Sequence, residues 1–455
     1  MRQGQAKILK WVSLPVTLCL VITYLAISFD GSEGGDSLLF GFGRIADVYV
    51  TASAPEYIGL TGDLYTGAGE WSGADVPLKN EKGDLFTGAA ERSGADAPLK
   101  SDRLPMLPRS IQVKGHWAKG SVGMVNFTES PLVKQQQRCL KRMLSPLAPY
   151  PKNRLDEFHS FRWFPQGSTK AWDPKLEQSC LKGKKIAFVG DSTIVQEATA
   201  LVCQLSALGY EYDLTKLPDT NYTRRPWTQY EFPALKTKIT ASNHPFLLHA
   251  YFRIKPTKIF FDRLAPELVR LLETRTDMIV LNLGHWAGVN SAAYPDDVKK
   301  NSTWVYAHYK RLLSTTLDLL NDWFLKHAPV DYQPLILFKS TTGRHFEKGD
   351  WFSGGRCFRT EPIEYPWPAN YNSNNNKYEY TVELNRMAQR EIGGREFLFD
   401  LLYMDTTNFD HERADGHSTD IDCLHWMHPG IPDFLNTFSV RELCKHSKAL
   451  SPSAK

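Results

Sequence analysis

The chain has 455 residues, of which 42% are hydrophobic, 12% aromatic and 23% charged. This composition excludes wholesale disorder and is sufficient for one large α/β domain with appendages or for two to three average domains. The formal net charge of +4 is small for this length and is spread along the chain, so it gives no argument for binding to nucleic acid.

The N-terminal residues indicate a membrane anchor. Arg2, Lys7 and Lys10 precede the uncharged apolar run Trp11–Phe29. That run is long enough to span a bilayer, and its basic flank should stay cytosolic. We therefore predict a cytosolic tail over 1–10, a transmembrane signal anchor over 11–29 and a lumenal remainder. A cleaved signal peptide is the alternative, but the run is longer than a usual h-region and has no clear small-x-small cleavage site.

A stretch rich in Gly, Ala, Ser and Asp follows the anchor. Residues 62–79 recur as residues 83–100, with a period of 21 residues. Two copies are too few for a stable solenoid, and the composition is typical of a flexible chain. We predict a low-complexity stem over 30–130 and interpret the repeat as a duplication within a tolerant linker.

Glycosylation sequons and cysteines agree with a lumenal location. The sequons begin at Asn126, Asn221 and Asn301. Cys19 lies in the apolar run, and the remaining cysteines form an even set that permits three disulfides in an oxidising compartment. These six are Cys139, Cys180, Cys203, Cys357, Cys423 and Cys444. They contain no CxxC pair, so their spacing does not predict a structural zinc site.

From 131 to 455 the pattern is that of a folded α/β domain. Short apolar runs are typical of buried parallel strands, and segments of helical spacing lie between them. The predicted strands are 186–189, 278–281, 335–338 and 397–401, and the predicted helices are 194–208, 266–274, 303–326 and 381–392. Their alternation predicts a parallel sheet with helices on both faces.

Polar motifs follow the predicted strands. They are Gly190-Asp191-Ser192, Asn282–Trp286, Ser340–His345 and, shortly after the fourth strand, Asp422-Cys-Leu-His425. In open α/β sheets the ligand crevice lies at the carboxyl ends of the strands, so we expect these motifs to meet there.

Ser192 is the predicted nucleophile. It lies where a buried strand feeds a helix, and the free N–H groups and dipole of a helix N-terminus favour developing negative charge. His425 is the predicted general base, and Asp422 would orient its ring. Asp191 is expected to support the turn. The alternative is that Gly-Asp-Ser only caps the helix.

Other polar and aromatic residues are candidates to support the reaction. The Asn282 amide would donate to an oxyanion beside the N–H of Ser192, although it is alternatively a turn-forming residue before Gly284. The candidates to line an acceptor site are His285, Trp286, Arg344, His345 and Trp351. For the two histidines of this set, a buried side chain on a packed loop is the default alternative.

The C-terminal part of the chain also permits a metal site. Asp410, His411, Asp415, His417, Asp420 and His428 are crowded together and are residue types that bind divalent metals and activate water. This alternative has no recognisable ligand spacing and gives no role to the Gly-Asp-Ser turn. We therefore predict no metal and no bound cofactor.

Cys357 and Cys423 each flank a motif that we expect at the same rim of the crevice. We therefore predict that these two cysteines are bonded. Cys139–Cys203 and Cys180–Cys444 are then the expected remaining pairs, although six cysteines allow many other pairings.

The ordered motifs resemble the trichome-birefringence-like proteins, the PC-esterase branch of the SGNH/GDSL hydrolases. The resemblance covers roughly 139–446 and rests on residues 161–165, 189–192, 282–286, 345–357, 361–363 and 422–433. It implies an SGNH-hydrolase-like parallel sheet, a triad of Ser192, Asp422 and His425, and an oxyanion-hole role for Asn282. It further implies a Golgi polysaccharide O-acetyltransferase.

Together these observations predict a single-pass type II Golgi membrane protein with a lumenal catalytic domain. It would transfer an acyl group, acetyl above all, to a hydroxyl of a polysaccharide or glycan. The resemblance implies acetyl-CoA or a derived carrier as the acyl donor. A carbohydrate acetylesterase with the same triad is the first alternative, and a catalytically silent glycan-binding or scaffolding protein is the second.

Overall fold

The computed structural model describes residues 104–119, 130–143, 152–171, 175–217, 227–244, 247–252, 259–285, 302–347, 355–363, 378–417 and 419–451. The predicted tail and anchor, the repeat, Asn126, Asn221, Asn301, Trp286 and Trp351 lie outside these residues. Within the described part of the chain, no helix is both long enough and apolar enough to cross a membrane.

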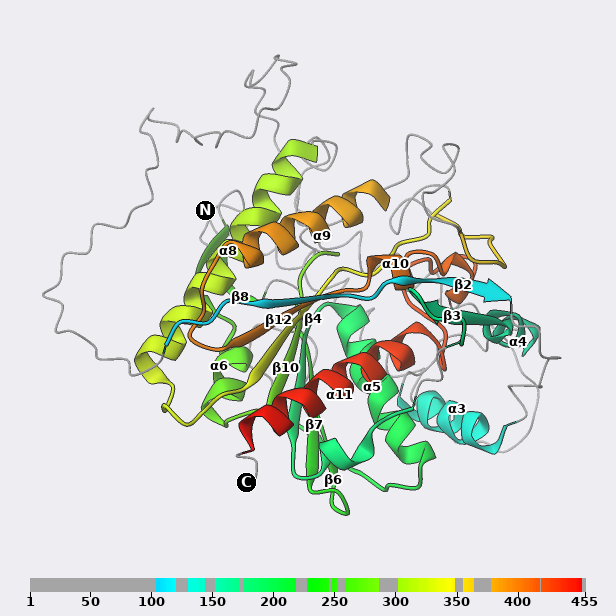
Figure 1. Ribbon diagram of the computed structural model, residues 1–455, viewed down its shortest axis with the longest axis horizontal. Coiled ribbons are helices and arrows are strands. Elements are labelled where there is room, and N and C mark those ends of the chain that lie inside the picture. Colours follow the sequence, from blue (N-terminus) through cyan, green and yellow to red (C-terminus); the bar gives the residue numbers. More distant parts are fainter. Residues whose placement is uncertain are drawn as a thin grey trace, which may run out of the picture. The chain divides into compact units, whose positions relative to one another are not determined.

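An eight-stranded sheet organises the described residues (Figure 1). Its order is β1-β12-β11-β10-β4-β7-β6-β5. From β1 to β7 every neighbouring pair is parallel, whereas β6 and β5 extend the sheet with antiparallel pairs. The strands are β1 Arg109–Gln112, β4 Lys185–Gly190, β5 Asp213–Lys216, β6 Thr228–Phe232, β7 Thr237–Asn243, β10 Met278–Asn282, β11 Leu335–Lys339 and β12 Asp400–Asp405.

Helices and two small hairpins surround this sheet. The helices are α3 Pro131–Met143, α4 Lys152–Ser160, α5 Ser192–Ala207, α6 Pro266–Glu273, α8 Ser302–His327, α9 Tyr378–Gly393, α10 Thr407–Asp410 and α11 Ile431–Leu450, with short 3-10 turns η2 Gln178–Leu181 and η4 Ala414–Gly416. The hairpins pair β2 Gly115–Lys119 with β3 Phe161–Pro165, and β8 Leu248–Phe252 with β9 Ile259–Leu264.

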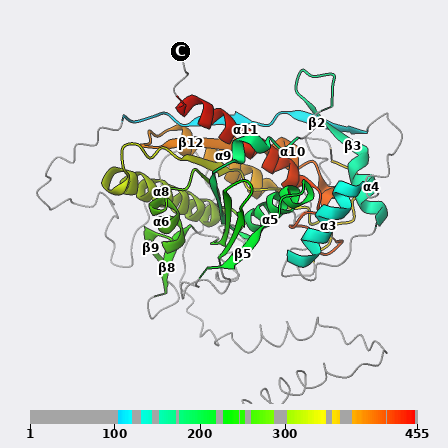
Figure 2. The same ribbon diagram turned by 90° about the horizontal axis from the view of Figure 1, so that it is seen from below.

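The central strands are buried on both faces, because successive side chains point to opposite faces of the sheet and helices cover both faces. In β4, Ile186 and Phe188 belong to the core that contains α5 and α11. Ala187 and Val189 belong to the core that contains α6, α8 and α9. Figure 1 shows α5 and α11 crossing in front of the central strands, and Figure 2 shows α11 and α8 on the two sides of β12. Burial on both faces explains why these strands are continuous apolar runs in the sequence.

The structure confirms the predicted strands and helices between 186 and 392 to within three residues at each end. The fourth predicted strand was placed too early, since 397–401 was expected and β12 spans Asp400–Asp405. Phe397 and Phe399 extend the apolar pattern ahead of the strand. Phe397 forms an isolated bridge with Met106, and Phe399 stacks on Phe324 at 4.7 Å between ring centroids. The apolar run therefore begins before the strand does.

The sheet takes β1 from the segment that the sequence analysis assigned to the stem. Arg109–Gln112 pairs in parallel with β12, and β2 also precedes the predicted domain start at 131. That predicted boundary therefore falls too late. The strand has no apolar signal because it lies at the sheet edge, where Ile111 is half-buried and its neighbours are exposed.

The strand order predicts a ligand crevice between β4 and β10. The chain leaves β4 through α5 and returns to β7 on one side, whereas β10 lies on the other side of β4. Such a reversal of winding direction opens a ligand crevice outside the carboxyl ends of the strands. Ser192 follows the carboxyl end of β4, and Asn282 is the last residue of β10.

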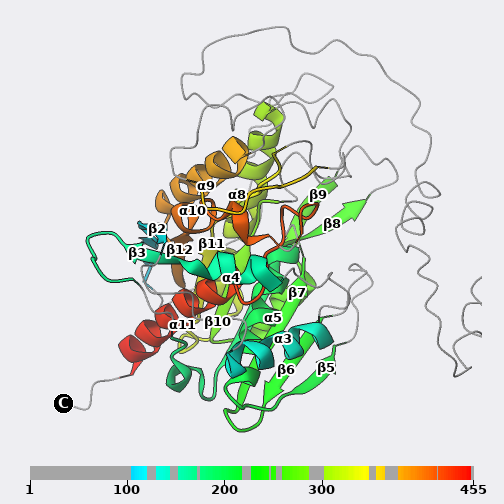
Figure 3. The ribbon, with the colours of Figure 1, turned by 90° about the vertical axis from the view of Figure 1, so that its right-hand side faces the viewer.

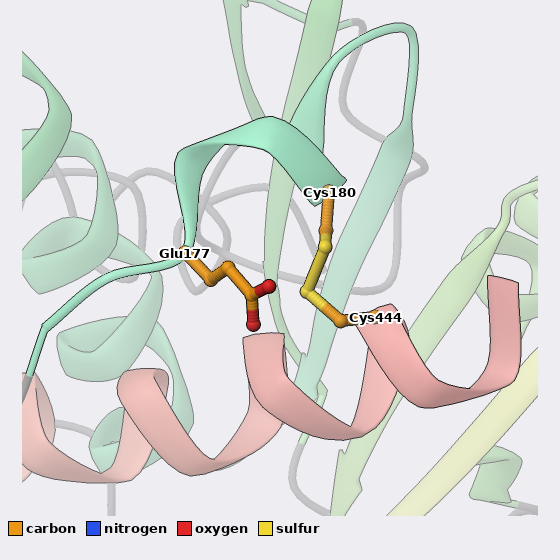
Figure 4. A group of neighbouring side chains, drawn as sticks. All are labelled: Glu177, Cys180 and Cys444. Atoms are coloured by element: carbon orange, nitrogen blue, oxygen red, sulfur yellow. A yellow bond between two sulfur atoms is a disulfide. The ribbon is translucent and has the colours of Figure 1, made fainter. Parts of the chain in front are cut away.

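Three disulfides connect distant elements. Cys139–Cys203 joins α3 to α5, which lie side by side in Figure 3, and Cys357–Cys423 joins two loops near the crevice. Cys180–Cys444 joins η2 to α11 (Figure 4). These are the same three pairs that the sequence analysis predicts.

The Cys180–Cys444 disulfide lies beside the carboxylate of Glu177 (Figure 4). In the described ranges these three residues are the only group whose atoms are close enough together to suggest metal ligands. Because the two sulfur atoms are bonded to each other, neither is a thiolate that could bind a metal.

Candidate active site

Ser192 is the first residue of α5 and directly follows the turn after β4. Asp191 is the N-cap of this helix, and its Oδ1 accepts hydrogen bonds from the backbone N–H of Thr193 at 2.9 Å and from the Thr193 hydroxyl at 2.6 Å. Asp191 is fully buried, whereas Ser192 is half-buried. Asp191 therefore supports the turn, and Ser192 is the residue of the motif that remains accessible.

Gly190 allows the ends of β4 and β10 to approach each other closely. A Cβ atom at this position would lie 2.7 Å from the Asn282 carbonyl oxygen and 3.2 Å from the Asn282 Cβ. Because the oxygen is a backbone atom, it has little room to retreat. The glycine thus brings the Ser192 turn beside Asn282.

His425 hydrogen bonds to Ser192 on one side and to Asp422 on the other. The His425 Nε2 lies 2.7 Å from the Ser192 Oγ, and Nδ1 lies 3.1 and 3.0 Å from the two Asp422 carboxylate oxygens. A carboxylate only accepts, so Nδ1 carries the proton and Nε2 accepts from the serine hydroxyl. This is the arrangement in which a histidine can withdraw the proton of a serine.

A tight turn fixes Asp422 relative to His425. The Asp422 Oδ1 accepts from the backbone N–H groups of His425 at 3.0 Å and Leu424 at 3.3 Å, and Thr419 Oγ1 accepts from the Asp422 N–H at 3.0 Å. Burial opposes ionisation of Asp422, but its hydrogen bonds with His425 and the charges of His425 and His417 outweigh burial and lower its pKa. The carboxylate is therefore ionised at neutral pH.

Gln196 connects the helix of the serine to the loop of the histidine. Its Oε1 accepts from the backbone N–H of Trp426 at 3.0 Å, and its Nε2 donates to the Trp426 carbonyl at 2.6 Å. Gln196 lies one turn after Ser192 on α5 and is buried. Sequence reasoning missed this residue, because a lone glutamine in an apolar helix gives no signal of its partner.

The Asn282 side chain is fully buried at the crevice. Neither its Oδ1 nor its Nδ2 has a hydrogen-bond partner in the structure as described. A buried amide without a partner is uncommon, and it leaves a donor available near the Ser192 turn. This is the position at which an oxyanion donor is useful.

A buried ion pair lies under the same turn. Lys339, the last residue of β11, is paired in register with Asn282, and its Nζ contacts the carboxylate of Glu197 on α5. Burial lowers the pKa of Lys339 to about 7, although the charges of Asp410 and Asp191 oppose the shift. The pair connects the strand that follows β10 to the helix that carries the serine.

His285 and Arg344 form a buried polar contact rather than an open lining. The Arg344 Nε donates to the His285 Nδ1 at 2.9 Å, and the Nη2 donates to the His285 carbonyl at 2.8 Å. The His285 Nε2 therefore carries the ring proton and donates to Thr342 Oγ1 at 3.0 Å. Burial, reinforced by the charge of Arg344, holds the pKa of His285 well below its usual range, so the ring is neutral.

Of the predicted acceptor residues, His285, Arg344 and His345 lie within the described part of the chain. His285 and His345 are buried, at 4% and 0% exposure, and both hydrogen bond to protein groups. Both histidines therefore match the alternative of a buried side chain on a packed loop rather than that of a residue that lines an acceptor site. Trp286 and Trp351 lie outside the described residues and remain predictions.

The residues of the alternative metal site are engaged with other partners. Asp415 binds Arg413, Asp420 binds Arg356, and His428 faces Asp433. His411 contacts Asp410 at 2.6 Å, and His417 lies between His345 and the His425 carbonyl. Three of the six thus pair with a residue outside the set, and within the described residues no three of the six bring their ligand atoms close together.

The comparisons with known proteins agree with this geometry. The sequence profile of the PC-esterase family, described as a GDSL/SGNH-like acyl-esterase family found in Pmr5 and Cas1p, matches residues 172–441. This range is more than half of the chain and contains Ser192, Asn282, Asp422 and His425. It begins after β3, so β1 and the β2–β3 hairpin lie outside it.

Proteins of Arabidopsis thaliana are similar to this chain. Protein trichome birefringence-like 24 is 25% identical over 379 residues, which cover 73% of this chain and 82% of the relative. Protein trichome birefringence-like 14 is 26% identical over 316 residues, which cover 63% and 76%. Protein trichome birefringence is 26% identical over 326 residues, which cover 65% and 51%.

Proposed function

Since the chain belongs to the PC-esterase family of GDSL/SGNH-like acyl-esterases, we propose that it transfers an acyl group, acetyl above all, to a hydroxyl of a polysaccharide or glycan. The observation that carries this proposal is the 2.7 Å contact between His425 Nε2 and Ser192 Oγ, with Asp422 bonded to the far side of the ring. In this proposal Ser192, His425 and Asp422 are the catalytic triad.

The first half of the reaction forms an acyl-enzyme. The Ser192 Oγ attacks the acyl carbonyl of the donor while His425 Nε2 takes the hydroxyl proton, and Asp422 stabilises the resulting imidazolium. In this proposal the Ser192 N–H and the Asn282 Nδ2 donate to the oxyanion. His425 then returns the proton to the leaving group of the donor, and Ser192 is left as an ester.

The second half transfers the acyl group to the acceptor. A sugar hydroxyl gives its proton to His425 and attacks the Ser192 ester carbonyl, and collapse of the oxyanion releases the acylated sugar. The Ser192 Oγ recovers its proton from His425, which completes the cycle. The same residues serve both halves because the two half-reactions are the same chemistry with different leaving groups.

Donor and compartment are further parts of this proposal. Acetyl-CoA or a carrier derived from it is the proposed donor, in accordance with the family resemblance. The apolar run Trp11–Phe29 and its basic flank support a type II anchor with the catalytic residues in the Golgi lumen. An oxidising lumen also suits the three disulfides.

A carbohydrate acetylesterase is the second candidate, and the acyl-esterase description of the family favours it. In that reaction water replaces the sugar hydroxyl in the second half, and the triad is unchanged. Transfer exceeds hydrolysis only where a sugar is positioned at the acyl-enzyme before water reaches it. Such positioning can lower the barrier to transfer by several kcal/mol.

The experiment that separates these functions gives purified enzyme a labelled acetyl donor and a panel of glycans. Transfer predicts label on one glycan class, with loss of labelling in Ser192→Ala. Release of free acetate alone, or faster removal of acetyl groups from pre-acetylated glycan than their addition, would identify an esterase. Label on glycans that persists in Ser192→Ala would contradict the proposed nucleophile.

A further inference from the structure

The His417 side chain lies between the catalytic histidine and a second buried histidine. Its Nδ1 is 2.9 Å from the backbone carbonyl oxygen of His425, and its Nε2 is 2.5 Å from the Nδ1 of His345. The His345 Nε2 is in turn 2.8 Å from the carbonyl oxygen of His411. Both rings are completely buried, so water does not complete these contacts.

These contacts require an additional proton. The outer nitrogens, His417 Nδ1 and His345 Nε2, face carbonyl oxygens that only accept, so each must carry a proton. If both rings were neutral, the two inner nitrogens would then face each other with lone pairs. A proton between them removes this repulsion, which gives the pair three ring protons and one positive charge.

The surroundings indicate which ring carries the charge. The His417 ring is stacked on Trp426, with 4.5 Å between ring centroids and an interplanar angle of 20°. A cation is favoured over the face of an indole, most of all where both groups are buried. We propose that His417 is a buried imidazolium which donates to the His425 carbonyl and to His345, and that it thereby positions the catalytic histidine.

Other ionisable groups surround the histidine pair. Burial and the charge of His417 hold the pKa of His345 well below its usual range, so His345 is the neutral partner. The charge of His417 also contributes to the lowered pKa values of Asp422 and His285. His411, His425 and Arg344 are the other charged or titratable groups that act on these residues.

One consequence follows for the reaction, and it rests on the proposed function. The bond to the His425 carbonyl fixes the backbone from which the base projects. Because His417 acts through this backbone, it is a positioning residue.

Nitrogen NMR of the full-length chain, labelled with ¹⁵N at histidine, tests the charge without any assay of activity. At about pH 8, well above the ordinary histidine pKa of about 6.5, the His417 ring should keep protons on both nitrogens. His446 is a matched control, because its nitrogens also face oxygens, those of Asp400 and Gln333. In the His446→Gln variant any signal of that ring is removed, and the signal of His417 should remain.

Variants of the His417–His345 pair assign the signal to His417 and give a second test of its charge. His345→Asn places an amide oxygen near the former Nδ1, so the His417 imidazolium should persist, whereas His345→Leu should abolish it. Absence of any doubly protonated ring at pH 8 after loss of the His446 signal would overturn the proposal. If His345→Leu fails to fold, the wild-type and His446→Gln spectra still show whether a doubly protonated ring is present at pH 8.

Kinetics then test the positioning role, with hydrolysis of an activated acetyl ester as the assay. His417→Asn keeps a donor for the His425 carbonyl, so it should retain most of the wild-type kcat. His417→Leu has no such donor and should lose about 100-fold in kcat, the loss that a displacement of a catalytic group by about 1 Å can cause. Equal kcat in His417→Leu and the wild type would contradict the positioning role, whereas an inactive wild type would contradict the proposed function alone.

Discussion

Ser192, the proposed nucleophile, contacts its proposed base His425, which lies 233 residues further along the chain. We expect Ser192→Ala to reduce acyl transfer by at least about a thousandfold, with His425→Ala nearly as severe and Asp422→Asn milder, because the members of a triad act as a unit. Ser206→Ala, the same substitution further along α5, is the matched control. Retention of more than a tenth of wild-type turnover by Ser192→Ala, with unchanged thermal unfolding, would exclude it as the nucleophile.

The buried pair of Lys339 and Glu197 gives a second prediction at this scale. Glu197→Gln removes the carboxylate that Lys339 contacts and should lower the free energy of unfolding by about 3 to 5 kcal/mol. The double variant Glu197→Leu/Lys339→Met removes both groups and should recover most of that loss, measured as urea midpoints. A double variant at least as destabilised as Glu197→Gln would contradict the prediction, because removal of both charges would then recover nothing.

Between elements, Asp400 connects β12 to β1 and α11. Its carboxylate accepts from Arg109 at 2.7 Å and from His446 Nδ1 at 2.7 Å. Burial opposes ionisation, but the hydrogen bonds and charges of these two residues prevail and lower the pKa of Asp400. The folded state therefore binds the proton more weakly than the unfolded chain, in which an aspartate has a pKa of about 3.9.

The sign of this shift predicts a dependence of stability on pH. The contribution of Asp400 should be fully present above about pH 5, and it should decline as the pH falls through the unfolded and then the folded pKa. The stability difference between wild type and Asp400→Asn should therefore shrink between about pH 5 and pH 2. Asp331→Asn, in an exposed pair with Arg275, is the control and should show a smaller change. A difference that grows on acidification would contradict the assignment.

At the scale of the whole molecule, the described fold begins before the expected domain boundary. Trp117 of β2 donates from Nε1 to the Phe409 carbonyl at 2.8 Å, and the Arg413 guanidinium lies 4.2 Å from its ring centroid. Arg413 is itself fully buried and paired with Asp415, two residues before His417. The β2–β3 hairpin thus packs directly against the loop that leads to the catalytic histidine.

Two truncations test this arrangement. A chain that begins at Ser101 and follows a cleavable secretion signal keeps β1 and β2 and should be secreted, folded and active. A chain that begins at Ser130 loses both strands and should unfold at least several degrees earlier, because it exposes Arg413 and the edge of β12. Identical unfolding temperatures for the two chains would show that the hairpin contributes nothing to the fold.

Features that a local pattern encodes were predictable from the sequence, whereas features that depend on distant partners were not. Strand β4 was predictable because burial on both faces makes it apolar throughout, and Ser192 because it follows such a strand. The exposed edge strand β1 has no comparable pattern. His417 was grouped with possible metal ligands, since its partners are a ring 72 positions away and a backbone carbonyl. Gln196, whose partner is also backbone, gave no signal.

The separation of Ser192 from His425 also has a consequence for biosynthesis. Ser192, the proposed nucleophile, is made first, and its proposed base His425 follows 233 residues later. Helix α11, which contributes to the core beside α5, is made later still. A nascent or prematurely terminated chain that stops before these segments therefore contains the Ser192 turn without its proposed base. Activity should appear only after α11 has been made, which would keep such partial products inert.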